Sequence, residues 1–575
     1  MRLQPIYDIA EICAQHGVAN AIVCPGSRCA PLTLAFARHP EITCRTFSDE
    51  RSACFIANGI AQQTQAPVGI VCTSGSAAYN FAPAIAEAFF QEIPLLVFTA
   101  DRPAEWIDQW DGQTIRQTNI FGAHVKKSYS LPQEYSTTDS VWHINRIVNE
   151  AILLAQEFPK GPVHINVPLR EPLYPAKDEK INFSKTKSVV RATSSSLELN
   201  QSDIVALRKT TAKYSKILVV GGQQDFHEGQ SKAVVKFCKN NHAALVGDII
   251  SNLHSLSEAV RHTDTFLGQC GDAVQKSLAP ELLITFGKSV ISKNLKVFLR
   301  KHKTLEHWHI QPTGNAADTF QSLTRVIHCT PNHFFESVAA VEMTEPFHDQ
   351  KKENYVRLWQ AEESRTMRSI EKYFDEMRFS EFHVLKEIIS SLPARCNVHL
   401  ANSMSVRYAN FIGLDEKNKG LHVFANRGTS GIDGCTSTAV GHALTSDVPN
   451  ILITGDMAFF YDRNAFWHNY PLPNLHVVIL NNHGGVIFNL IDGPGSLVEK
   501  DEYFITNQKL NASHLASEFG FDYLKLDTLK NIKNTVKDFF EFDGKTKILE
   551  IASDQKTSKK AFEQFKDTIK NGYEA

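Results

Sequence analysis

The sequence has few of the features that mark a secreted, zinc-stapled or membrane protein. Its 11 cysteines include no C-x-x-C pair and their number is odd, so a disulfide framework and a structural zinc site are both disfavoured. No segment offers the roughly 20 apolar residues that a membrane helix needs. The first residues, Met1 to Glu11, carry acids where a signal peptide needs an uninterrupted apolar run. We therefore expect a soluble cytoplasmic protein without a membrane partner.

An excess of charge of one sign is also absent. The chain has 60 Lys and Arg against 62 Asp and Glu, so we expect no nucleic-acid partner and no polyacidic role. Neither a G-x-S-x-G nor a Walker sequence is present. What the chain does have is length, because 575 residues predict roughly three or four domains.

Short apolar runs alternate with amphipathic stretches along the chain, which is typical of parallel α/β domains. The candidate buried strands are residues 20–24, 68–72, 94–98 and 161–167, then 216–220, 244–246 and 281–286, and finally 397–400, 451–454 and 476–480. His307 and His309 would lie on one face of a further strand, where we favour packing over a metal pair because no third ligand is evident.

The segments between these groups of strands predict the domain organisation. The polar stretch 184–202 is typical of a linker, and the charged segment 345–371 of an exposed connection followed by a helix. We therefore predict an α/β fold of three doubly wound parallel-sheet domains, with boundaries at 1–183, 203–340 and 355–575.

Two polar strand ends in the last third of the chain form the most informative motif. Asp456 follows one apolar run, and Asn482, 26 residues later, follows the next. Because the carboxyl ends of parallel strands meet at one edge of a sheet, the two side chains can converge. A carboxylate, an amide oxygen and a backbone carbonyl suit the oxygen shell of Mg²⁺, and Gly484 and Gly485 allow close approach to a phosphate. A Gly-Asp pair alone would indicate only a strand-end turn; Asn-Asn-x-Gly-Gly at this spacing favours the metal site.

This pattern resembles the signature of thiamine-diphosphate (ThDP) enzymes. The resemblance implies that Asp456, Asn482 and the carbonyl of Gly484 hold Mg²⁺, with Mn²⁺ as the alternative metal, and that the ion anchors the cofactor diphosphate. It assigns further residues to the cofactor site, namely Gly75, Ile432, Gly455, Met457, Gly485, Val486 and Ile487. Met457 departs from the glycine that is common in the family at that position.

Glu50, in the string Phe47-Ser48-Asp49-Glu50-Arg51, lies at a predicted strand-to-helix junction. By the same resemblance it would hydrogen-bond the aminopyrimidine ring of the cofactor and assist removal of the thiazolium C2 proton. Acids in the first turn of a helix are also stabilised by its dipole, so Glu50 by itself would not identify a site.

Further strings narrow the resemblance to one family. They are Cys24-Pro25-Gly26-Ser27-Arg28, Cys72-Thr73-Ser74-Gly75, Ala100-Asp101-Arg102-Pro103, Gln113-Thr114-Ile115-Arg116-Gln117 and Asn426-Arg427-Gly428-Thr429-Ser430-Gly431-Ile432-Asp433-Gly434. Together they closely resemble the 2-succinyl-5-enolpyruvyl-6-hydroxy-3-cyclohexene-1-carboxylate (SEPHCHC) synthases of menaquinone biosynthesis. The likeness covers the first and third predicted domains well and the middle one thinly.

The resemblance implies a carboligase that decarboxylates 2-oxoglutarate and adds the succinyl fragment to isochorismate in a 1,4-addition. It also implies a homodimer or a dimer of dimers, with the cofactor between the first domain of one subunit and the third of another. Both substrates are dianions, which guanidinium groups bind well. By family match, Ser403, Arg407 and Arg427 would orient the succinyl part, and Ser27, Arg28, Arg102, Gln113 and Lys293 the ring substrate.

Two positions depart from the common family pattern, and two other functions stay open. Asn294 follows Lys293 where relatives often have Arg, and Gly112 precedes Gln113 where some have Asn. These departures predict rearranged contacts to isochorismate. The alternatives are another ThDP-dependent 2-oxo-acid decarboxylase or acetolactate-type synthase, and a non-catalytic ThDP-binding protein.

Overall fold

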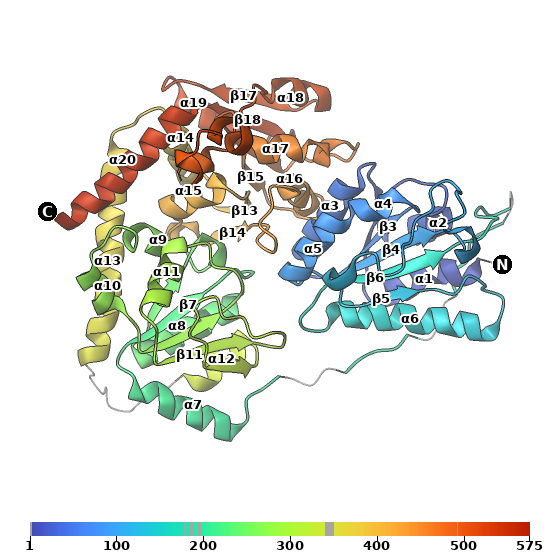
Figure 1. Cartoon of the computed structure of the whole chain (residues 1–575), viewed down its shortest axis with the longest axis horizontal. Helices are drawn as coiled ribbons and strands as arrows, with labels where there is room; N and C mark the ends of the chain where they lie inside the picture. Colours follow the sequence, from blue (N-terminus) through green and yellow to red (C-terminus); the bar gives the residue numbers. More distant parts are fainter. Residues whose placement is uncertain are drawn as a thin grey trace. The chain divides into compact units, whose positions relative to one another are not determined.

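The computed structural model describes residues 3–176, 179–184, 189–193, 197–339, 350–490 and 493–574 (Figure 1). The strands form three six-stranded sheets whose paired strands run parallel. The predicted parallel α/β fold class is therefore confirmed. The chain divides into two compact units, the first made of residues 1–194, 426–450 and 458–475 and the second of residues 195–425, 451–457 and 476–575.

The first sheet, in the first unit, has the strand order β2-β1-β3-β4-β6-β5. Its strands are β1 (Asn20–Val23), β2 (Thr43–Thr46), β3 (Val68–Cys72), β4 (Leu95–Asp101), β5 (Ser128–Ser130) and β6 (Val163–Pro168). One face is covered by α1 (Gln4–Gln15), α2 (Ala30–Arg38) and α6 (Thr138–Gln156), whose core residues include Ile6, Phe36 and Val148. The same unit contains α3 (Glu50–Thr64), α4 (Ser76–Asn80), α5 (Ala82–Gln91) and α16 (Cys435–Ala443).

Helices α3 and α16 lie in unusually close contact. A Cβ at Gly59 would lie 2.1 Å from the carbonyl oxygen of Thr438, and one at Gly441 would lie 2.2 Å from that of Ile56. Only glycine fits at these two positions because any side chain would meet backbone. The contact holds the helix that begins at Glu50 against the helix that follows the 426–434 loop.

The central sheet has the strand order β12-β11-β10-β7-β8-β9. Its strands are β7 (Ile217–Gly221), β8 (Ala244–Gly247), β9 (Ala259–Val260), β10 (Leu282–Phe286), β11 (Glu306–Gln311) and β12 (Arg325–His328). Alternate residues of β7 belong to different cores, with Ile217 and Val219 on one face and Leu218 and Val220 on the other. The first face packs on α7 (Gln201–Lys213), α8 (Glu228–Asn241) and α12 (Pro331–Val338), the second on α9 (Thr263–Phe266), α10 (Asp272–Leu278) and α11 (Lys293–Lys301).

His307 and His309 do lie on one strand of this sheet, β11. A ring nitrogen of each lies within hydrogen-bonding distance of the Thr285 hydroxyl, at 2.9 Å and 2.8 Å. The described residues contain no cluster of three His, Cys, Asp or Glu side chains that could hold a metal ion. The observed contacts of the two rings include these hydrogen bonds to Thr285, within the central sheet.

The third sheet has the strand order β14-β13-β15-β16-β18-β17. Its strands are β13 (Arg395–Leu400), β14 (Gly420–Phe424), β15 (Asn450–Gly455), β16 (Leu475–Asn481), β17 (Asp522–Leu526) and β18 (Lys547–Ala552). One face carries α14 (Glu381–Ser390), α15 (Met404–Ile412), α19 (Ile532–Phe539) and α20 (Gln555–Glu574), joined by a core that includes Phe382, Tyr408 and Phe565. The short helix α17 (Asp456–Tyr461) follows β15, and the short helix α18 (Ser513–Phe519) precedes β17.

The two predicted connections are partly confirmed. Within 184–202, residues 185–188 and 194–196 lie outside the described residues, and helix α7 already begins at Gln201. The predicted helix in 345–371 is α13 (Gln350–Asp375), although residues 345–349 lie outside the described part. This helix is amphipathic, with Tyr355, Trp359 and Glu363 buried on one of its faces. Charged residues on its other face hid that amphipathic pattern.

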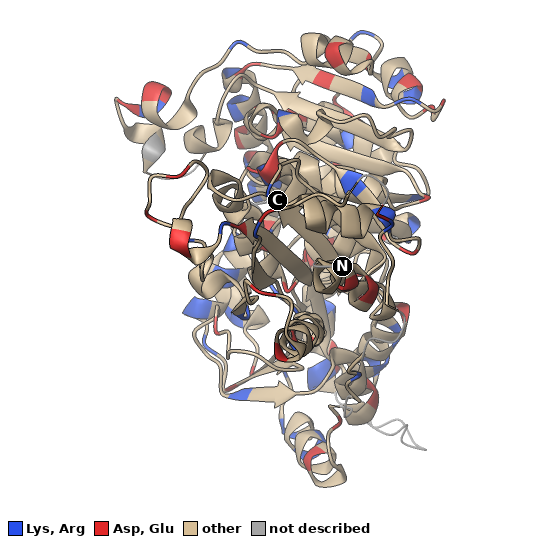
Figure 2. Ribbon diagram, turned by 90° about the vertical axis from the view of Figure 1, so that its right-hand side faces the viewer, with Lys and Arg blue, Asp and Glu red and all other residues tan. Residues whose placement is uncertain are grey.

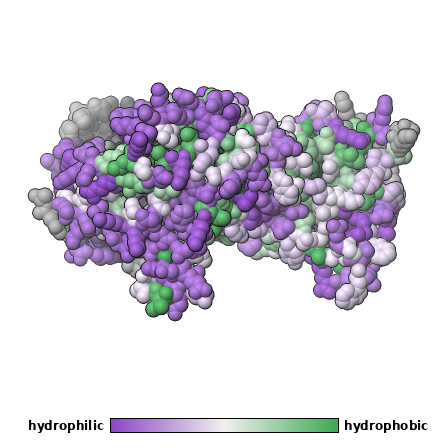
Figure 3. Space-filling view, turned by 90° about the horizontal axis from the view of Figure 1, so that it is seen from above, coloured by the Kyte–Doolittle hydropathy of each residue, from purple (hydrophilic) through white to green (hydrophobic). Residues whose placement is uncertain are grey.

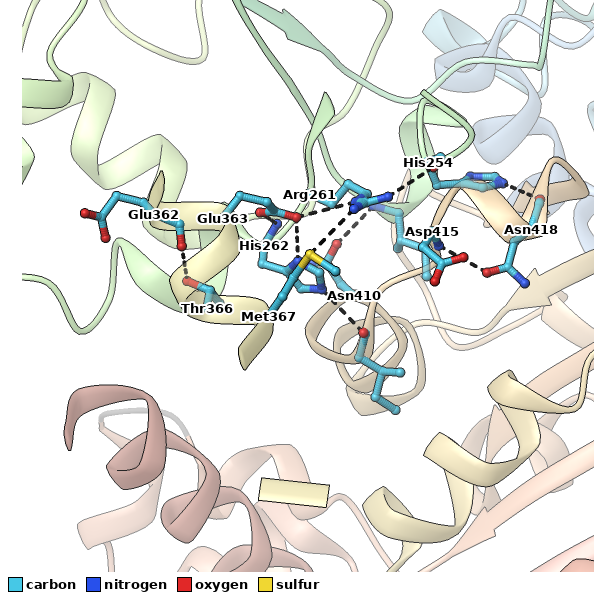
Figure 4. Close-up of polar contacts among 12 residues, drawn as sticks. His254, Arg261, His262, Glu362, Glu363, Thr366, Met367, Asn410, Asp415 and Asn418 are labelled. Carbon is cyan, nitrogen blue, oxygen red and sulfur yellow. Dashed lines mark hydrogen bonds and ion pairs between the residues drawn. The ribbon is translucent and has the colours of Figure 1, made fainter. Parts of the chain in front are cut away.

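A buried polar network joins α13 to β9 and α15 within the second unit (Figure 4). Glu363 accepts a hydrogen bond from the His262 N–H (3.0 Å) and lies 2.8 Å from His262 Nδ1 and 3.4 Å from Arg261 Nε. Next to this network is a cavity of about 340 Å³, lined by acids such as Glu371 and Asp415 and by bases such as Lys386. Arg261 and Lys417 also line the cavity, so three bases face two acids and the lining has a small excess of positive charge.

The views in Figures 2 and 3 show charged and hydrophobic residues in mixed arrangements. Basic and acidic residues are interspersed over helices and loops (Figure 2). On the face seen in Figure 3, hydrophobic residues form small patches among hydrophilic ones. Among the described residues, no helix combines the length and the apolar composition that a bilayer crossing requires.

Candidate active site

Asp456 and Asn482 follow the ends of two neighbouring parallel strands of the third sheet. Asp456 comes directly after β15 and Asn482 directly after β16, and both side chains are buried. The sequence predicted that Asp456 and Asn482 would lie at the same edge of a sheet, and the neighbouring positions of β15 and β16 agree with that prediction. Gly455 ends β15, and Met457 continues the first turn of α17.

Polar neighbours hold both side chains, and the backbone N–H groups of Met457 and Gly484 are among those of Asp456. Gln508 Nε2 donates to Asp456 Oδ2 at 2.6 Å and lies 3.3 Å from Asn481 Oδ1. Asn482 Nδ2 donates to Glu381 Oε2 at 3.0 Å. These contacts leave Asn482 Oδ1 buried without a hydrogen-bond partner among the described residues.

The donors at this strand edge fit a hard divalent cation. Buried polar atoms are normally satisfied, so the unpartnered Asn482 Oδ1 is an acceptor that a bound cation could use. Burial raises the pKa of Asp456 to about 7, and a cation beside it would favour the ionised form. The Gly484 carbonyl accepts from the Val486 N–H at 3.0 Å and retains a second lone pair. The chain therefore offers carboxylate, amide and carbonyl oxygens, the set that Mg²⁺ prefers.

The glycines after Asn482 permit a tight backbone path. A Cβ at Gly484 would lie 2.9 Å from the carbonyl oxygen of Ile505, and the Gly485 N–H donates to that same oxygen at 2.8 Å. Val486 and Ile487 then begin a short 3₁₀-helix, Val486–Asn489. This path brings backbone rather than side chains to the strand edge.

Glu50 is the first residue of α3, as the strand-to-helix prediction required. The helix is capped by Asp49, whose carboxylate accepts from the N–H groups of Arg51 (2.9 Å) and Ser52 (3.3 Å). Because Asp49 provides the cap, the half-buried Glu50 is not needed for that purpose and can act on a ligand. Asn80 Nδ2 donates to the Glu50 carboxylate at 3.3 Å.

Gly75 and Gln113 lie side by side at the carboxyl edge of the first sheet. Gly75 has φ +90°, and a Cβ there would lie 3.4 Å from Gln113 Cα. Its N–H donates at 2.8 Å to Oε1 of Gln117, a buried residue that also donates to the Ala100 carbonyl. Gln117 belongs to one of the sequence motifs quoted above but was not predicted as a site residue. Its side chain connects its own loop to the loops that contain Gly75 and Ala100.

The predicted residues Ser27, Arg28 and Arg102 surround the same loops. Arg28 is buried and donates to the Leu169 carbonyl at 3.0 Å, and burial, with the neighbouring Arg102 charge second, lowers its pKa. Arg102 donates to the Gly112 carbonyl at 3.0 Å. Ser27 is exposed, with its hydroxyl 3.0 Å from the Tyr174 hydroxyl. Each guanidinium also faces an acid, with Glu171 Oε1 3.4 Å from Arg28 and Asp111 Oδ2 3.2 Å from Arg102, so an anionic ligand would exchange with these ion pairs.

The loop that carries Arg427 and Ile432 is held by a buried acid, Glu87 of α5. The Gly428 and Thr429 N–H groups donate to its two carboxylate oxygens at 2.9 Å and 2.6 Å. After the loop, Gly434 has φ +79° and contacts the Phe55 ring so closely that a Cβ would lie 2.1 Å away. Ile432 itself remains 36% exposed, as a residue that contacts a ligand must.

Ser403 and Arg407 meet at the start of α15 in the second unit. Ser403 has φ +71°, a strained conformation for a residue other than glycine, and its carbonyl accepts from Arg407 Nη1 at 2.6 Å. Such strain persists where the surroundings fix it, and it occurs often at functional sites.

Lys293 begins α11 with its side chain exposed. Its neighbour Asn294 donates through Nδ2 to the Asp264 carbonyl at 2.6 Å, and the Asn294 N–H donates to the Asp264 carboxylate at 2.8 Å. Burial raises the pKa of Asp264, and the Arg407 charge is among the groups that lower it. Asn294 thus has a local structural role, and Asp264 links the Lys293 turn to Arg407.

The predicted residues fall into two groups. The first unit holds Ser27, Glu50, Gly75, Gln113, Arg28, Arg102, Arg427 and Ile432, and the second holds Lys293, Ser403, Arg407, Asp456 and the 482–487 loop. Sequence reasoning missed three supporting residues, the buried Glu87 and Glu381 and the partly buried Gln508. No motif marks them, because each acts through a partner that is distant in the sequence.

Comparison with known families matches two parts of the chain. Residues 7–120 match the family described as "Thiamine pyrophosphate enzyme, N-terminal TPP binding domain", thiamine pyrophosphate being another name for ThDP. Residues 185–400 match "Middle domain of thiamine pyrophosphate". The second match covers the part of the chain that the sequence motifs described least.

Curated relatives match nearly the whole chain. A protein of Cytophaga hutchinsonii is 43% identical over 572 residues, which cover 99% of this chain and 100% of the relative. Proteins of Flavobacterium johnsoniae (38% over 545 residues, 94% and 95%) and Bacteroides fragilis (36% over 573 residues, 98% and 99%) are also similar. All three are named 2-succinyl-5-enolpyruvyl-6-hydroxy-3-cyclohexene-1-carboxylate synthase.

Proposed function

The chain belongs to the SEPHCHC synthase family of ThDP-dependent enzymes, and from that premise we propose that it decarboxylates 2-oxoglutarate and joins the succinyl fragment to isochorismate, releasing CO₂. The observation that carries this proposal is the Asp456–Asn482 pair on neighbouring strand ends, in a chain 43% identical over its length to a relative of that name. The resemblance derived from the sequence is confirmed at the level of family and fold.

The proposed metal is Mg²⁺, with Mn²⁺ as the alternative. The proposed ligands are Asp456, Asn482 and the Gly484 carbonyl, supported by the buried, unpartnered Asn482 Oδ1. When bound, ThDP supplies the carbanion chemistry by which a 2-oxo acid loses CO₂ and its acyl fragment attacks an acceptor. We assign Gly75, Ile432, Gly455, Met457, Gly485, Val486 and Ile487 to the cofactor site.

Glu50 is the proposed acid toward the cofactor. It lies at the amino end of α3, where Asp49 already caps the helix, so its carboxyl is available to hold or accept a proton at an aminopyrimidine nitrogen.

The remaining predicted residues form the proposed substrate site. Two dianionic substrates bring up to four carboxylates, which suit bidentate hydrogen bonds from guanidinium groups. We assign Ser403, Arg407 and Arg427 to the succinyl part, and Ser27, Arg28, Arg102, Gln113 and Lys293 to the ring substrate. Burial and then the neighbouring Arg102 charge lower the pKa of Arg28, and two cations this close support an anion site at the first-sheet loops.

We further propose three domains, at residues 1–183 (pyrimidine-binding), 203–340 (central) and 355–575 (diphosphate-binding), each containing one sheet. The proposed assembly is a homodimer or a dimer of dimers, and large exposed aromatic residues in the first unit, Tyr79 and Phe90, support a protein contact there. The proposed location is the cytoplasm, supported by 11 cysteines that all remain free thiols.

The test is an omission assay on purified full-length protein. With ThDP, Mg²⁺ and 2-oxoglutarate present, loss of isochorismate absorbance should require every component and should accompany CO₂ release. Pyruvate in place of 2-oxoglutarate should support little turnover. Turnover of pyruvate without isochorismate would instead favour a decarboxylase or an acetolactate-type synthase, and ThDP binding without turnover a non-catalytic protein.

A further inference from the structure

We propose that Glu381 is a positioning residue that fixes the amide of Asn482 with its oxygen toward the metal. This inference rests on the proposed metal site and goes beyond it, because Glu381 touches neither the metal nor the substrate. It acts through a single hydrogen bond.

The buried position of Glu381 calls for an explanation. It is the first residue of α14, its side chain is fully buried, and its Oε2 accepts the 3.0 Å hydrogen bond from Asn482 Nδ2. Burying a carboxyl group is costly unless it has a role that offsets the cost. The α14 cap does not supply that role, since Ser380 accepts from the His383 N–H at 3.2 Å. The hydroxyl groups of Ser558, Tyr408 and Ser553 also lie beside the Glu381 carboxyl, but Asn482 is the neighbour that belongs to the proposed metal site.

An asparagine side chain has nearly the same shape in its two flipped orientations, so neighbouring groups decide which end faces where. A carboxylate accepts hydrogen bonds and cannot donate them. Glu381 therefore draws the NH₂ end of Asn482 toward itself, which turns Oδ1 away. That oxygen is the buried atom without a partner among the described residues. In the flipped orientation, NH₂ would face the cation and the amide could not be a ligand.

Asp456 needs no neighbour to select the orientation of its side chain. Both of its side-chain atoms facing the site are oxygens, so the 2.6 Å hydrogen bond from Gln508 steadies the carboxylate without selecting an orientation. Glu381 is thus the neighbour whose removal would change the identity of the atom offered to the metal. Groups that orient metal ligands in this way typically contribute about 10- to 100-fold to metal affinity.

The first test measures the Mg²⁺ concentration that half-saturates ThDP binding to the full-length protein, followed by intrinsic fluorescence or calorimetry. Glu381→Met keeps the volume but removes the acceptor, and should raise that concentration about 10- to 100-fold. Glu381→Gln retains an acceptor oxygen and should remain within about threefold of wild type. The matched control is Glu362→Gln, another buried acid of the same unit, whose contact is to the Tyr573 hydroxyl; it should bind Mg²⁺ normally.

The second test exchanges the carboxylate and the amide between positions 381 and 482. It does not require the Glu381→Met variant to fold. Asn482→Asp should place two acceptors face to face and weaken Mg²⁺ binding. Adding Glu381→Gln should place an amide donor opposite the new carboxylate and recover most of the affinity. Wild-type affinity in Glu381→Met, or a double variant no better than Asn482→Asp, would overturn the role of Glu381. If the wild-type protein binds ThDP without any Mg²⁺ dependence, the proposed metal site itself fails.

Discussion

Glu87 accepts two hydrogen bonds from one residue, Thr429, through its N–H and its hydroxyl, each at 2.6 Å. The two residues are 342 positions apart in the sequence. The Gln91 side chain and the Gly428 N–H donate to the other carboxylate oxygen at 2.5 Å and 2.9 Å. Four donors therefore converge on one buried carboxylate, and the loop between Arg427 and Ile432 is fixed by it.

Glu87→Gln should impair the proposed site without unfolding the protein. The amide NH₂ would face at least one N–H group of the loop, and a hydrogen bond to a charged group is worth about 1.5–3 kcal/mol. We expect kcat/KM for 2-oxoglutarate to fall about 10- to 100-fold. Steady-state kinetics and a thermal melt check this, with the exposed Glu41→Gln as the control. A parallel loss of melting temperature and activity, with KM unchanged, would indicate a purely structural role.

Glu50→Gln should retain the fold and ThDP binding but slow the removal of the cofactor C2 proton. General acid–base catalysis is typically worth about 10² to 10⁴ in rate. Hydrogen–deuterium exchange at C2 of bound ThDP, followed by NMR after acid quench, measures the step directly. Near-normal exchange would exclude Glu50 from the role.

Asp456→Ala should weaken cofactor binding through the metal. Removal of the carboxylate takes away one of three proposed ligands and the only one that carries a negative charge. ThDP affinity, titrated against Mg²⁺ by calorimetry, should fall most at low Mg²⁺ concentration. An unchanged Mg²⁺ dependence would contradict the assignment.

The buried strands could be predicted from the sequence, whereas the edge strands could not. The interior strands β1, β3, β4 and β16 are continuous apolar runs, because parallel strands with helices on both faces are buried throughout. The edge strands β2 (Thr43–Thr46) and β12 (Arg325–His328) are largely exposed and polar, so no run marks them. Strand β18 is buried but was missed, because Lys547 and Glu550 interrupt its apolar pattern.

The residues of the proposed site also include some that could be predicted from the sequence and some that could not. Residues that contact ligands lie at strand ends and in short motifs, so Asp456, Asn482 and Glu50 could be chosen from the sequence. The residues that hold them could not be chosen. Glu87 and Glu381 resemble ordinary helix acids in the sequence, and only tertiary structure shows that they are buried beside site residues. Asn294, noted as a departure from the family pattern, proves to be one more such support through its hydrogen bonds to Asp264.

The network around Glu363 predicts how stability depends on pH (Figure 4). Burial alone would raise the pKa of Glu363, but the contacts with His262 and Arg261 outweigh it and lower the pKa to about 2. A depressed acid pKa stabilises the fold above the unfolded-state value, near 4.3, and that contribution is lost as the pH falls toward 2. A shift of roughly two units corresponds to about 3 kcal/mol in total, of which about half is lost by one unit below the unfolded-state pKa.

Glu363→Gln should therefore melt at a lower temperature than wild type at pH 7, and the difference should shrink as the pH is lowered from about 5 toward 3. Acids outside this network titrate in both proteins, so the difference between them reports on Glu363 and its contacts with His262 and Arg261. Thermal melts across that range measure it, with Glu371→Gln, exposed on the same helix, as the control. A difference that stays constant with pH would show that Glu363 stabilises the contact between α13 and the residues after β9 through its shape and neutral hydrogen bonds rather than through its charge.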